Sequence, residues 1–182
     1  MTDSLPITVD LDGTLIFNEI SFFTLIKYLK QKPWGVFMVM YWWIRGFNPY
    51  VKQQLAKSAT FDPSELDFNE PLLMSLGTLH SQGRKLLLVT GADQAHADLI
   101  AHHAGIFSGA HGSNGKVNLI GKNKAAFLSE TFGRKGFIYY GNSWQDVKVW
   151  EAAASGVAVN APDALKAYVK HKFPHVEVFS GQ

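Results

Sequence analysis

Short apolar segments alternate with helical patterns along the second part of the chain, and this alternation limits the possible folds more than any other feature. The apolar segments are KLLLVTG (85–91), IFSGAHGS (106–113), GFIYYGNS (136–143), VAVNA (157–161) and VEVF (176–179). The helical patterns occupy residues 70–83, 93–105, 122–133, 144–156 and 162–173. Such alternation is typical of βαβ units, in which helices cover both faces of a parallel sheet.

A helical stretch separates the first strand from this core. Residues 6–9 read as a buried strand that ends in the turn DLDG. Helical spacing of apolar residues then follows at 18–31, at 33–46, which begins at a proline and stops at a glycine, and at 48–59. We therefore predict the α/β class: a Rossmann-like parallel sheet core flanked by helices (1–16 and 70–182), with an all-α cap inserted after the first strand (17–69).

The composition excludes several classes of protein. The 182 residues carry a formal net charge of +2 without any basic run, which argues against a nucleic-acid partner. Because the chain has no cysteine, it has no disulfide, thiolate metal site or cysteine nucleophile. The first residues, MTDSLP, lack the basic and apolar regions of a secretory signal, so we expect a cytoplasmic protein.

The stretch PWGVFMVMYWWI (33–44) is almost wholly apolar, but it is about half the ~20 residues that a membrane-spanning helix requires. The commonest interpretation of its aromatic residues is that they form the packing face of the cap; the alternative is a face toward lipid or substrate. These residues are Trp34, Phe37, Tyr41, Trp42 and Trp43. The alternative would make the protein peripheral to a membrane.

Two carboxylates stand at the end of the first strand. Asp10 and Asp12 are two residues apart, so in an extended chain they face the same side. Their repulsion is costly unless a cation or a proton lies between them. The pair predicts a metal, a shared proton, or both.

Other polar residues follow the later strands. In parallel sheets functional groups collect at the carboxyl ends of the strands, near the point where the strand order reverses. The groups expected there are Asp10 and Asp12, Thr90 and Gly91, then Gly141, Asn142, Ser143 and Asp146, with Lys124 at the start of a helix. Carboxylates, a hydroxyl, a cation and oxygen ligands for a hard metal ion together suit phosphoryl transfer.

These segments resemble the four motifs of the haloacid dehalogenase superfamily in its phosphatase form, in the right order. The matching segments are DLDGTL, LLLVTG, Lys124 in GKNKAAFL, and GFIYYGNSWQDV. The resemblance implies that Asp10 attacks phosphorus to form an aspartyl-phosphate, while Asp12 protonates the leaving oxygen and then activates water. It further implies that Thr90 and Lys124 bind the phosphoryl group, with Gly13, Thr14 and Gly91 beside it.

The resemblance also implies a Mg²⁺ cofactor on the Asp10 carboxylate, the Asp12 carbonyl oxygen and the fourth motif. Many members have Asp where this chain has Asn142, and Asp146 could supply the missing charge directly or through water. The sequence Gly-Asn-Ser resembles, more loosely, a branch found beside or fused to membrane prenyltransferases. That branch also has a helical insert after the first motif.

Two functions follow as expectations. The first is Mg²⁺-dependent hydrolysis of a small or lipid-linked phosphate monoester. The alternative is a catalytically weak or inactive relative, whose aromatic cap binds a membrane, a lipid-linked phosphate, a second copy or another protein. His96, His102 and His103 have no Cys or acidic residue at ligand spacing, so we interpret them as surface or half-buried side chains.

Overall fold

A computed structural model describes residues 4–179 of the protein, apart from the side chains of residues 46–48. The predicted core segments extend to residues 1–3 and 180–182, which lie outside the described residues, as do the first residues of MTDSLP. The centre of the fold is a six-stranded parallel sheet in the order β3-β2-β1-β4-β5-β6. The predicted α/β class is confirmed.

The strand order reverses between β1 and β4. The strands are β1 (Ile7–Val9), β2 (Leu86–Asp93), β3 (Ala110–Ser113), β4 (Ile138–Gly141), β5 (Ser155–Ala158) and β6 (Val176–Val178). In β1, Val9 is in register with Leu88 on one side and with Tyr140 on the other. The chain that leaves β1 therefore enters the crevice at the switch point, where open α/β sheets bind ligands.

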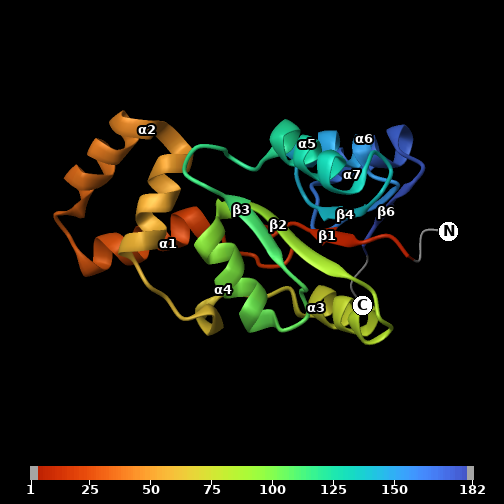
Figure 1. Cartoon of the computed structure of the whole chain (residues 1–182), viewed down its shortest axis with the longest axis horizontal. Helices are drawn as coiled ribbons and strands as arrows, with labels where there is room; N and C mark the ends of the chain where they lie inside the picture. The colour runs from red at the N-terminus through yellow and green to blue at the C-terminus, as the bar shows by residue number, and fades with distance from the viewer. Residues whose placement is uncertain (1–3, 180–182) are drawn as a thin grey trace.

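Helices cover both faces of the sheet, because the strands are apolar on both sides (Figure 1). The core helices are α3 (Glu70–Ser81), α4 (Gln94–Ala104), α5 (Gly121–Phe132), α6 (Val147–Ala152) and α7 (Asp163–Lys172). Leu87 and Val89 of β2 pack in one hydrophobic cluster with residues of α5, α6 and α7. Leu86 and Leu88 pack with residues of α3 and α4 in a second cluster. All eight residues of β2 are buried.

Strand β5 begins two residues before the segment predicted for it. We predicted that the strand starts after Gly156, because residues 144–156 read as a helix. In the structure Gly156 belongs to the strand, and a Cβ atom there would lie 2.5 Å from the Trp150 ring. Glycine is therefore needed at this position because the indole of α6 packs directly on the strand backbone.

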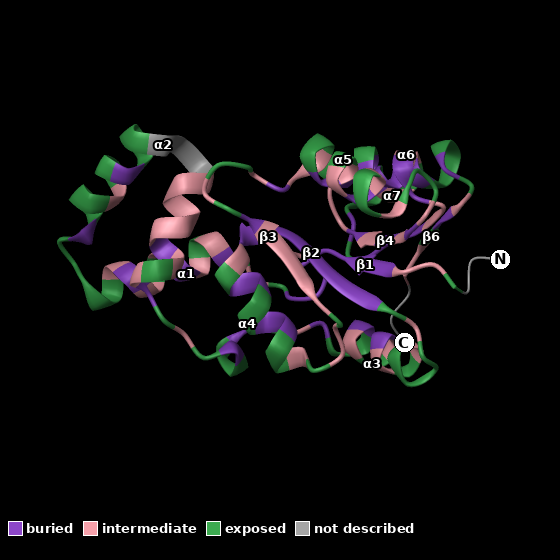
Figure 2. Cartoon of the chain, in the orientation of Figure 1, coloured by how far each residue is buried: buried purple, intermediate pink, exposed green. Residues whose placement is uncertain are grey.

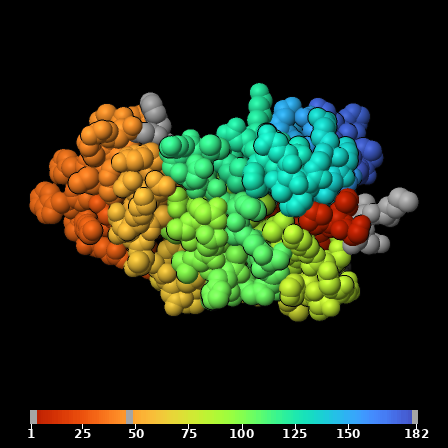
Figure 3. Space-filling model, in the orientation of Figure 1, coloured from red at the N-terminus to blue at the C-terminus, as the bar shows by residue number. Residues whose placement is uncertain are grey.

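The helical insert contains two helices, α1 (Ile20–Gln31) and α2 (Gly35–Ser58), which together form a cap over one end of the sheet (Figures 1 and 3). The predicted stop at Gly46 is wrong, because α2 continues as one helix with Pro49 inside it. A proline removes one backbone hydrogen bond and bends a helix rather than always ending it. Figure 1 shows this bend midway along α2.

The connections between cap and core lie side by side. The Phe17 amide donates a hydrogen bond to the Asp67 carbonyl oxygen (2.8 Å), and the Asn69 amide donates to the Leu15 carbonyl oxygen (2.9 Å). After α2, a short 3₁₀ turn (Pro63–Glu65) follows, and the Phe61 ring packs on His96 of α4, with centroids 5.3 Å apart. The last part of the predicted insert thus packs against the core, and its helices occupy residues 20–58.

The aromatic stretch of α2 is mostly exposed, which corrects the interpretation that it forms the packing face of the cap. Among its five predicted packing residues only Trp42 is buried, against Tyr28 of α1 at a centroid distance of 5.4 Å. Trp34, Phe37 and Trp43 expose 83%, 66% and 58% of their surface. No helix in the described part of the chain is long and apolar enough to cross a membrane.

Candidate active site

A cavity of about 600 Å³ lies between the cap and the carboxyl ends of the central strands. Its polar part brings together many of the predicted site residues: Asp10, Asp12, Gly91, Lys124, Asn142, Ser143 and Asp146. Its other wall comes largely from the cap, through Phe22 and Leu25 of α1 and Val51, Lys52 and Leu55 of α2. Gly13, Thr14 and Thr90 are not among the residues that line it.

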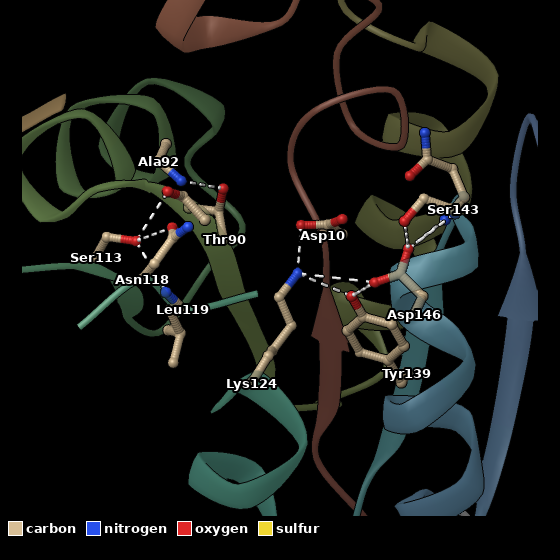
Figure 4. Close-up of polar contacts among 12 residues, drawn as sticks. Asp10, Thr90, Ala92, Ser113, Asn118, Leu119, Lys124, Tyr139, Ser143 and Asp146 are labelled. Atoms are coloured by element: carbon tan, nitrogen blue, oxygen red, sulfur yellow. Dashed lines mark hydrogen bonds and ion pairs between the residues drawn. The ribbon is translucent and has the colours of Figure 1, made fainter. Parts of the chain in front are cut away.

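A buried cation lies beside Asp10 (Figure 4). Lys124 is 2% exposed, and its Nζ atom lies 2.7 Å from Asp10 Oδ1 and 3.9 Å from Asp146 Oδ1. The same Nζ atom lies 2.9 Å from the hydroxyl of Tyr139, whose ring packs under the lysine chain. Helix α5 therefore places one positive charge between carboxylates that follow two neighbouring strands.

Burial controls the protonation of Asp10. The pKa of Asp10 is raised from 3.8 to about 7: loss of water is the largest cause, Lys124 lowers the pKa, and Asp146 and Asp12 add to the rise. A carboxylate at this position depends on nearby positive charge to remain ionised at neutral pH. A second cation beside Asp10 would supply the positive charge that Lys124 alone does not provide.

Asp146 holds the loop that follows β4. Its Oδ2 atom accepts hydrogen bonds from the amides of Asn142 (3.1 Å) and Ser143 (2.9 Å) and from the Ser143 hydroxyl (2.8 Å). Its Oδ1 atom accepts a 2.5 Å hydrogen bond from the Tyr139 hydroxyl. Burial raises the pKa of Tyr139 well above its ordinary value of 10, so this hydroxyl keeps its proton. Because its carboxylate accepts four hydrogen bonds, three of them from Asn142 and Ser143, the geometry favours a role for Asp146 in positioning the loop.

Glycine at position 141 allows this loop to approach the carboxylate. A Cβ atom on Gly141 would lie 2.7 Å from the Tyr139 ring and 2.8 Å from the Asp146 carboxyl carbon. Any side chain would therefore separate β4 from the network beneath it. The glycine of the fourth motif is required here for packing.

The second carboxylate, Asp12, contacts the cap. Its Oδ1 atom accepts a 2.7 Å hydrogen bond from the amide of Ile20, the first residue of α1. Burial raises the pKa of Asp12, whereas the Ile20 amide lowers it. The next residue, Gly13, has a positive φ of 73°. A Cβ atom on Gly13 would lie 2.0 Å from Asn142 Nδ2, so the Asn142 side chain packs directly on the backbone of the loop after β1.

The predicted phosphoryl-binding hydroxyls are fully buried. Thr90 Oγ1 accepts a 3.0 Å hydrogen bond from the Ala92 amide, which supports the extended end of β2. Thr14 Oγ1 has no hydrogen-bond partner among the described residues, and the Thr14 carbonyl oxygen accepts from Asn69. Contact of either hydroxyl with phosphate stays a prediction.

The sequence motifs did not indicate Lys52, Ser113 or Asn118, because tertiary structure alone brings these residues to the edge of the pocket. Lys52 of α2 donates a 2.8 Å hydrogen bond to the Gly91 carbonyl oxygen and lies 3.4 Å from Asn118 Oδ1. Ser113 of β3 donates to the same Gly91 oxygen (2.8 Å) and lies 3.2 Å from Asn118 Oδ1. A lysine inside an apolar cap helix was the one available signal.

The histidines of α4 lie outside the pocket. His96 is 5% exposed, which corrects its interpretation as a surface or half-buried residue, and burial lowers its pKa. His102 and His103 are exposed, as expected, and the His103 ring stacks on Phe68. Across residues 4–179 no group of three or more His, Cys, Asp or Glu side chains could hold a metal ion. A metal at the pocket would need amide or carbonyl oxygens as well.

Comparison with solved structures defines the class of fold. A phosphoserine phosphatase in its apo form matches 98% of this chain and 95% of its own, with a TM-score of 0.65 and 14% identity. A predicted phosphoglycolate phosphatase from Haemophilus somnus 129pt matches 97% and 95%, with a TM-score of 0.56 and 19% identity. The structural neighbours are haloacid dehalogenase phosphatases, and at this level of identity the comparison shows that the chain has their fold.

Further similarity comes from proteins that have no assigned function. A protein with unknown function from Bordetella pertussis Tohama I matches 98% of this chain and 100% of its own, with a TM-score of 0.68 and 15% identity. No family model matches the sequence. The uncharacterized protein y4nM of Sinorhizobium fredii (strain NBRC 101917 / NGR234) is 38% identical over 174 residues. These residues are 96% of this chain and 33% of y4nM, so the chain spans a third of the length of this curated relative.

Proposed function

We propose that the protein is a Mg²⁺-dependent hydrolase of phosphate monoesters that uses Asp10 as its nucleophile. The observation that carries the proposal is the buried ion pair of Asp10 and Lys124, on the polar side of a capped pocket at the switch point of the sheet. Charge neutralisation and positioning are the main sources of catalysis in phosphoryl transfer. The fold shared with phosphatases supports the same reaction class.

In the first half of the reaction, a bond forms between an Asp10 carboxylate oxygen and phosphorus while the ester P–O bond breaks. Lys124 lowers the pKa of Asp10, but burial still holds that pKa at about 7, so full ionisation of the nucleophile at neutral pH needs a further cation. Asp12 gives its proton to the leaving oxygen. Burial raises the pKa of Asp12 toward the range where a general acid is effective.

In the second half, water attacks the phosphorus of the aspartyl-phosphate and Asp12 takes up the proton of that water. The P–O bond to Asp10 breaks, which releases inorganic phosphate and restores both carboxyl groups. Asp146 and Tyr139 act as positioning residues, because they hold Lys124 and the loop that bears Asn142. The Ile20 amide, at the start of α1, fixes the carboxyl group of Asp12 by its hydrogen bond to Oδ1.

The oxygen donors at the pocket fit a Mg²⁺ ion. They are the Asp10 carboxylate, the Asp12 main-chain carbonyl oxygen and the Asn142 amide oxygen, all hard ligands of the kind that Mg²⁺ prefers. The raised pKa of Asp10 supports the fit, because the cluster carries more buried acid than Lys124 neutralises. When bound, Mg²⁺ would supply positive charge to the phosphoryl oxygens.

The cap wall indicates the kind of leaving group. Phe22, Leu25, Val51 and Leu55 give the pocket an apolar side opposite the carboxylates, and Lys52 adds one cation. A phosphate ester with an apolar portion, including a lipid-linked phosphate, would bury that portion against this wall.

The test is release of coloured phenolate from p-nitrophenyl phosphate with and without Mg²⁺, followed by a screen of small and lipid-linked phosphate esters. We expect turnover that requires Mg²⁺ and falls at least about a thousandfold in Asp10→Asn. Asp163→Asn is the matched control, since Asp163 is an exposed residue of α7, and it should keep full activity. A wild type that hydrolyses none of these esters would contradict the proposal and favour the alternative of an inactive binding protein.

A further inference from the structure

The first half of α2 has an inverted pattern of exposure for a helix of a water-soluble protein. Among residues 35–45, only Gly35 and Trp42 are buried and Val39 is half-buried, which gives one narrow stripe against α1. The outward face carries the larger apolar side chains. Figure 2 shows this half of α2 as mainly exposed.

We call this outward face the cap patch. It consists of Trp34, Val36, Phe37, Met38, Met40, Tyr41, Trp43 and Ile44, whose exposures range from 45% to 83%. Phe37, Tyr41 and Ile44 follow one another at spacings of four and three, so they form a continuous ridge. A contiguous apolar patch of this kind marks an interaction surface, whereas single exposed apolar residues are ordinary.

The charge around the cap patch is positive, which favours a negatively charged partner. Residues 20–61 contain six Lys or Arg residues and no Asp or Glu, while all 15 acidic residues of the chain lie elsewhere. Lys30 and Lys32 precede the patch, Arg45 ends it, and all three are exposed. Arg45 donates a 2.9 Å hydrogen bond to the Tyr41 hydroxyl, so its charge lies at the edge of the aromatic ridge.

We propose that the cap patch docks on the surface of an anionic lipid bilayer. Aromatic side chains beside Lys and Arg suit the boundary between headgroups and acyl chains, where the rings are apolar and the cations meet lipid phosphates. The bent α2 lies at the end of the molecule away from the sheet, where a flat surface can approach it (Figures 1 and 3). None of the eight patch residues lines the pocket, so docking leaves the pocket unblocked.

A second copy of the cap suits this surface less well. A two-fold interface places the same patch on both sides, so Lys30, Lys32 and Arg45 of the two copies would face each other. Residues 20–61 contain no acidic side chain to pair with them. The same residues favour a negatively charged lipid surface.

Sedimentation of the intact protein with phosphatidylcholine vesicles, with and without phosphatidylglycerol, tests the proposal. We expect binding to the anionic vesicles that weakens when salt is raised from 50 mM to 500 mM. The triple variant Trp34→Gln, Phe37→Gln and Ile44→Gln should bind about tenfold or more weakly, because it removes the three most exposed apolar side chains of the cap patch. The matched control is Met74→Gln, Leu99→Gln and Val117→Gln, which removes three exposed apolar residues of the core and should bind like wild type.

A second pair of variants tests the charge. Lys30→Gln with Lys32→Gln should reduce binding to anionic vesicles, whereas Lys116→Gln with Lys170→Gln, both exposed on the core, should not. Circular dichroism and hydrolysis of a water-soluble ester should be unchanged in the patch variants. Wild type that ignores anionic vesicles, equal losses in patch and control variants, or a dimer that only the patch triple dissociates would each overturn the proposal.

Discussion

Lys52 of the cap helix α2 donates a 2.8 Å hydrogen bond to the carbonyl oxygen of Gly91 in strand β2 of the core. The two residues are 39 positions apart, and the bond crosses the pocket boundary between cap and core. Burial lowers the pKa of Lys52, while Asp12 and Glu19 raise it. The contact therefore couples the position of the cap to the strand end that carries the second motif.

Replacing Lys52 with Met should loosen the cap. The variant loses a charged hydrogen bond but keeps a side chain of similar length, so we expect KM to rise about tenfold with kcat changed by less than about threefold. Lys57→Met, on the exposed side of the same helix, is the control. A large fall in kcat at constant KM would show instead that Lys52 acts on the reacting phosphoryl group.

Asn142→Asp should strengthen metal binding. A carboxylate adds a charge and a second oxygen beside Asp10, so the half-saturating Mg²⁺ concentration should fall by about tenfold. The control Asn118→Asp adds the same charge near Lys52 and should change the half-saturating Mg²⁺ concentration far less. An unchanged Mg²⁺ requirement in Asn142→Asp would mean that position 142 does not contact the metal.

Asp146→Asn should destabilise the fold as well as slow turnover. The amide cannot accept from all the donors that Asp146 satisfies, and its own NH₂ group would face them. We expect the free energy of unfolding to fall by about 1–3 kcal/mol. Denaturant unfolding measures this, with Asp163→Asn as the exposed control. Unchanged stability together with a raised Mg²⁺ requirement would assign Asp146 to the metal.

The buried His96 should make stability depend on pH. Burial lowers its pKa below the ordinary 6.5, so as pH falls the unfolded chain takes up a proton before the folded protein does. The stabilisation is complete above about pH 6.5 and is lost as pH falls through the lowered pKa. Thermal unfolding at pH 7 and pH 5 should therefore show a larger decrease for wild type than for His96→Leu, whereas the exposed His80→Leu should behave as wild type. Equal decreases in the unfolding temperature of wild type and His96→Leu would show that His96 does not cause the pH dependence.

The sheet could be predicted because each strand carries its own signal. Segments such as KLLLV are apolar on both faces, which is the pattern of a parallel strand covered by helices, and the parallel order then places Asp10, Asn142 and Lys124 at one edge. Local pattern and tertiary structure agree at these positions.

The cap was harder to predict, because its local signals are ambiguous. Gly46 and Pro49 are typical helix breakers, yet α2 runs through both. Trp42 and Trp43 are neighbouring residues of the same type, and only the tertiary contact with Tyr28 shows that Trp42 is the buried one. Lys52 and Tyr139 reach the site through tertiary contacts, which no local motif encodes.

The most direct test of the central claim is mass spectrometry of the peptide that contains Asp10, after acid quench during turnover of p-nitrophenyl phosphate with Mg²⁺. Asp12→Asn should help the intermediate accumulate, because p-nitrophenolate leaves without protonation, whereas hydrolysis of the aspartyl-phosphate needs the base. The account predicts a phosphoryl group on Asp10 in this variant and none in Asp10→Asn. Turnover with Asp10 unmodified, or a phosphoryl group on another residue, would contradict it.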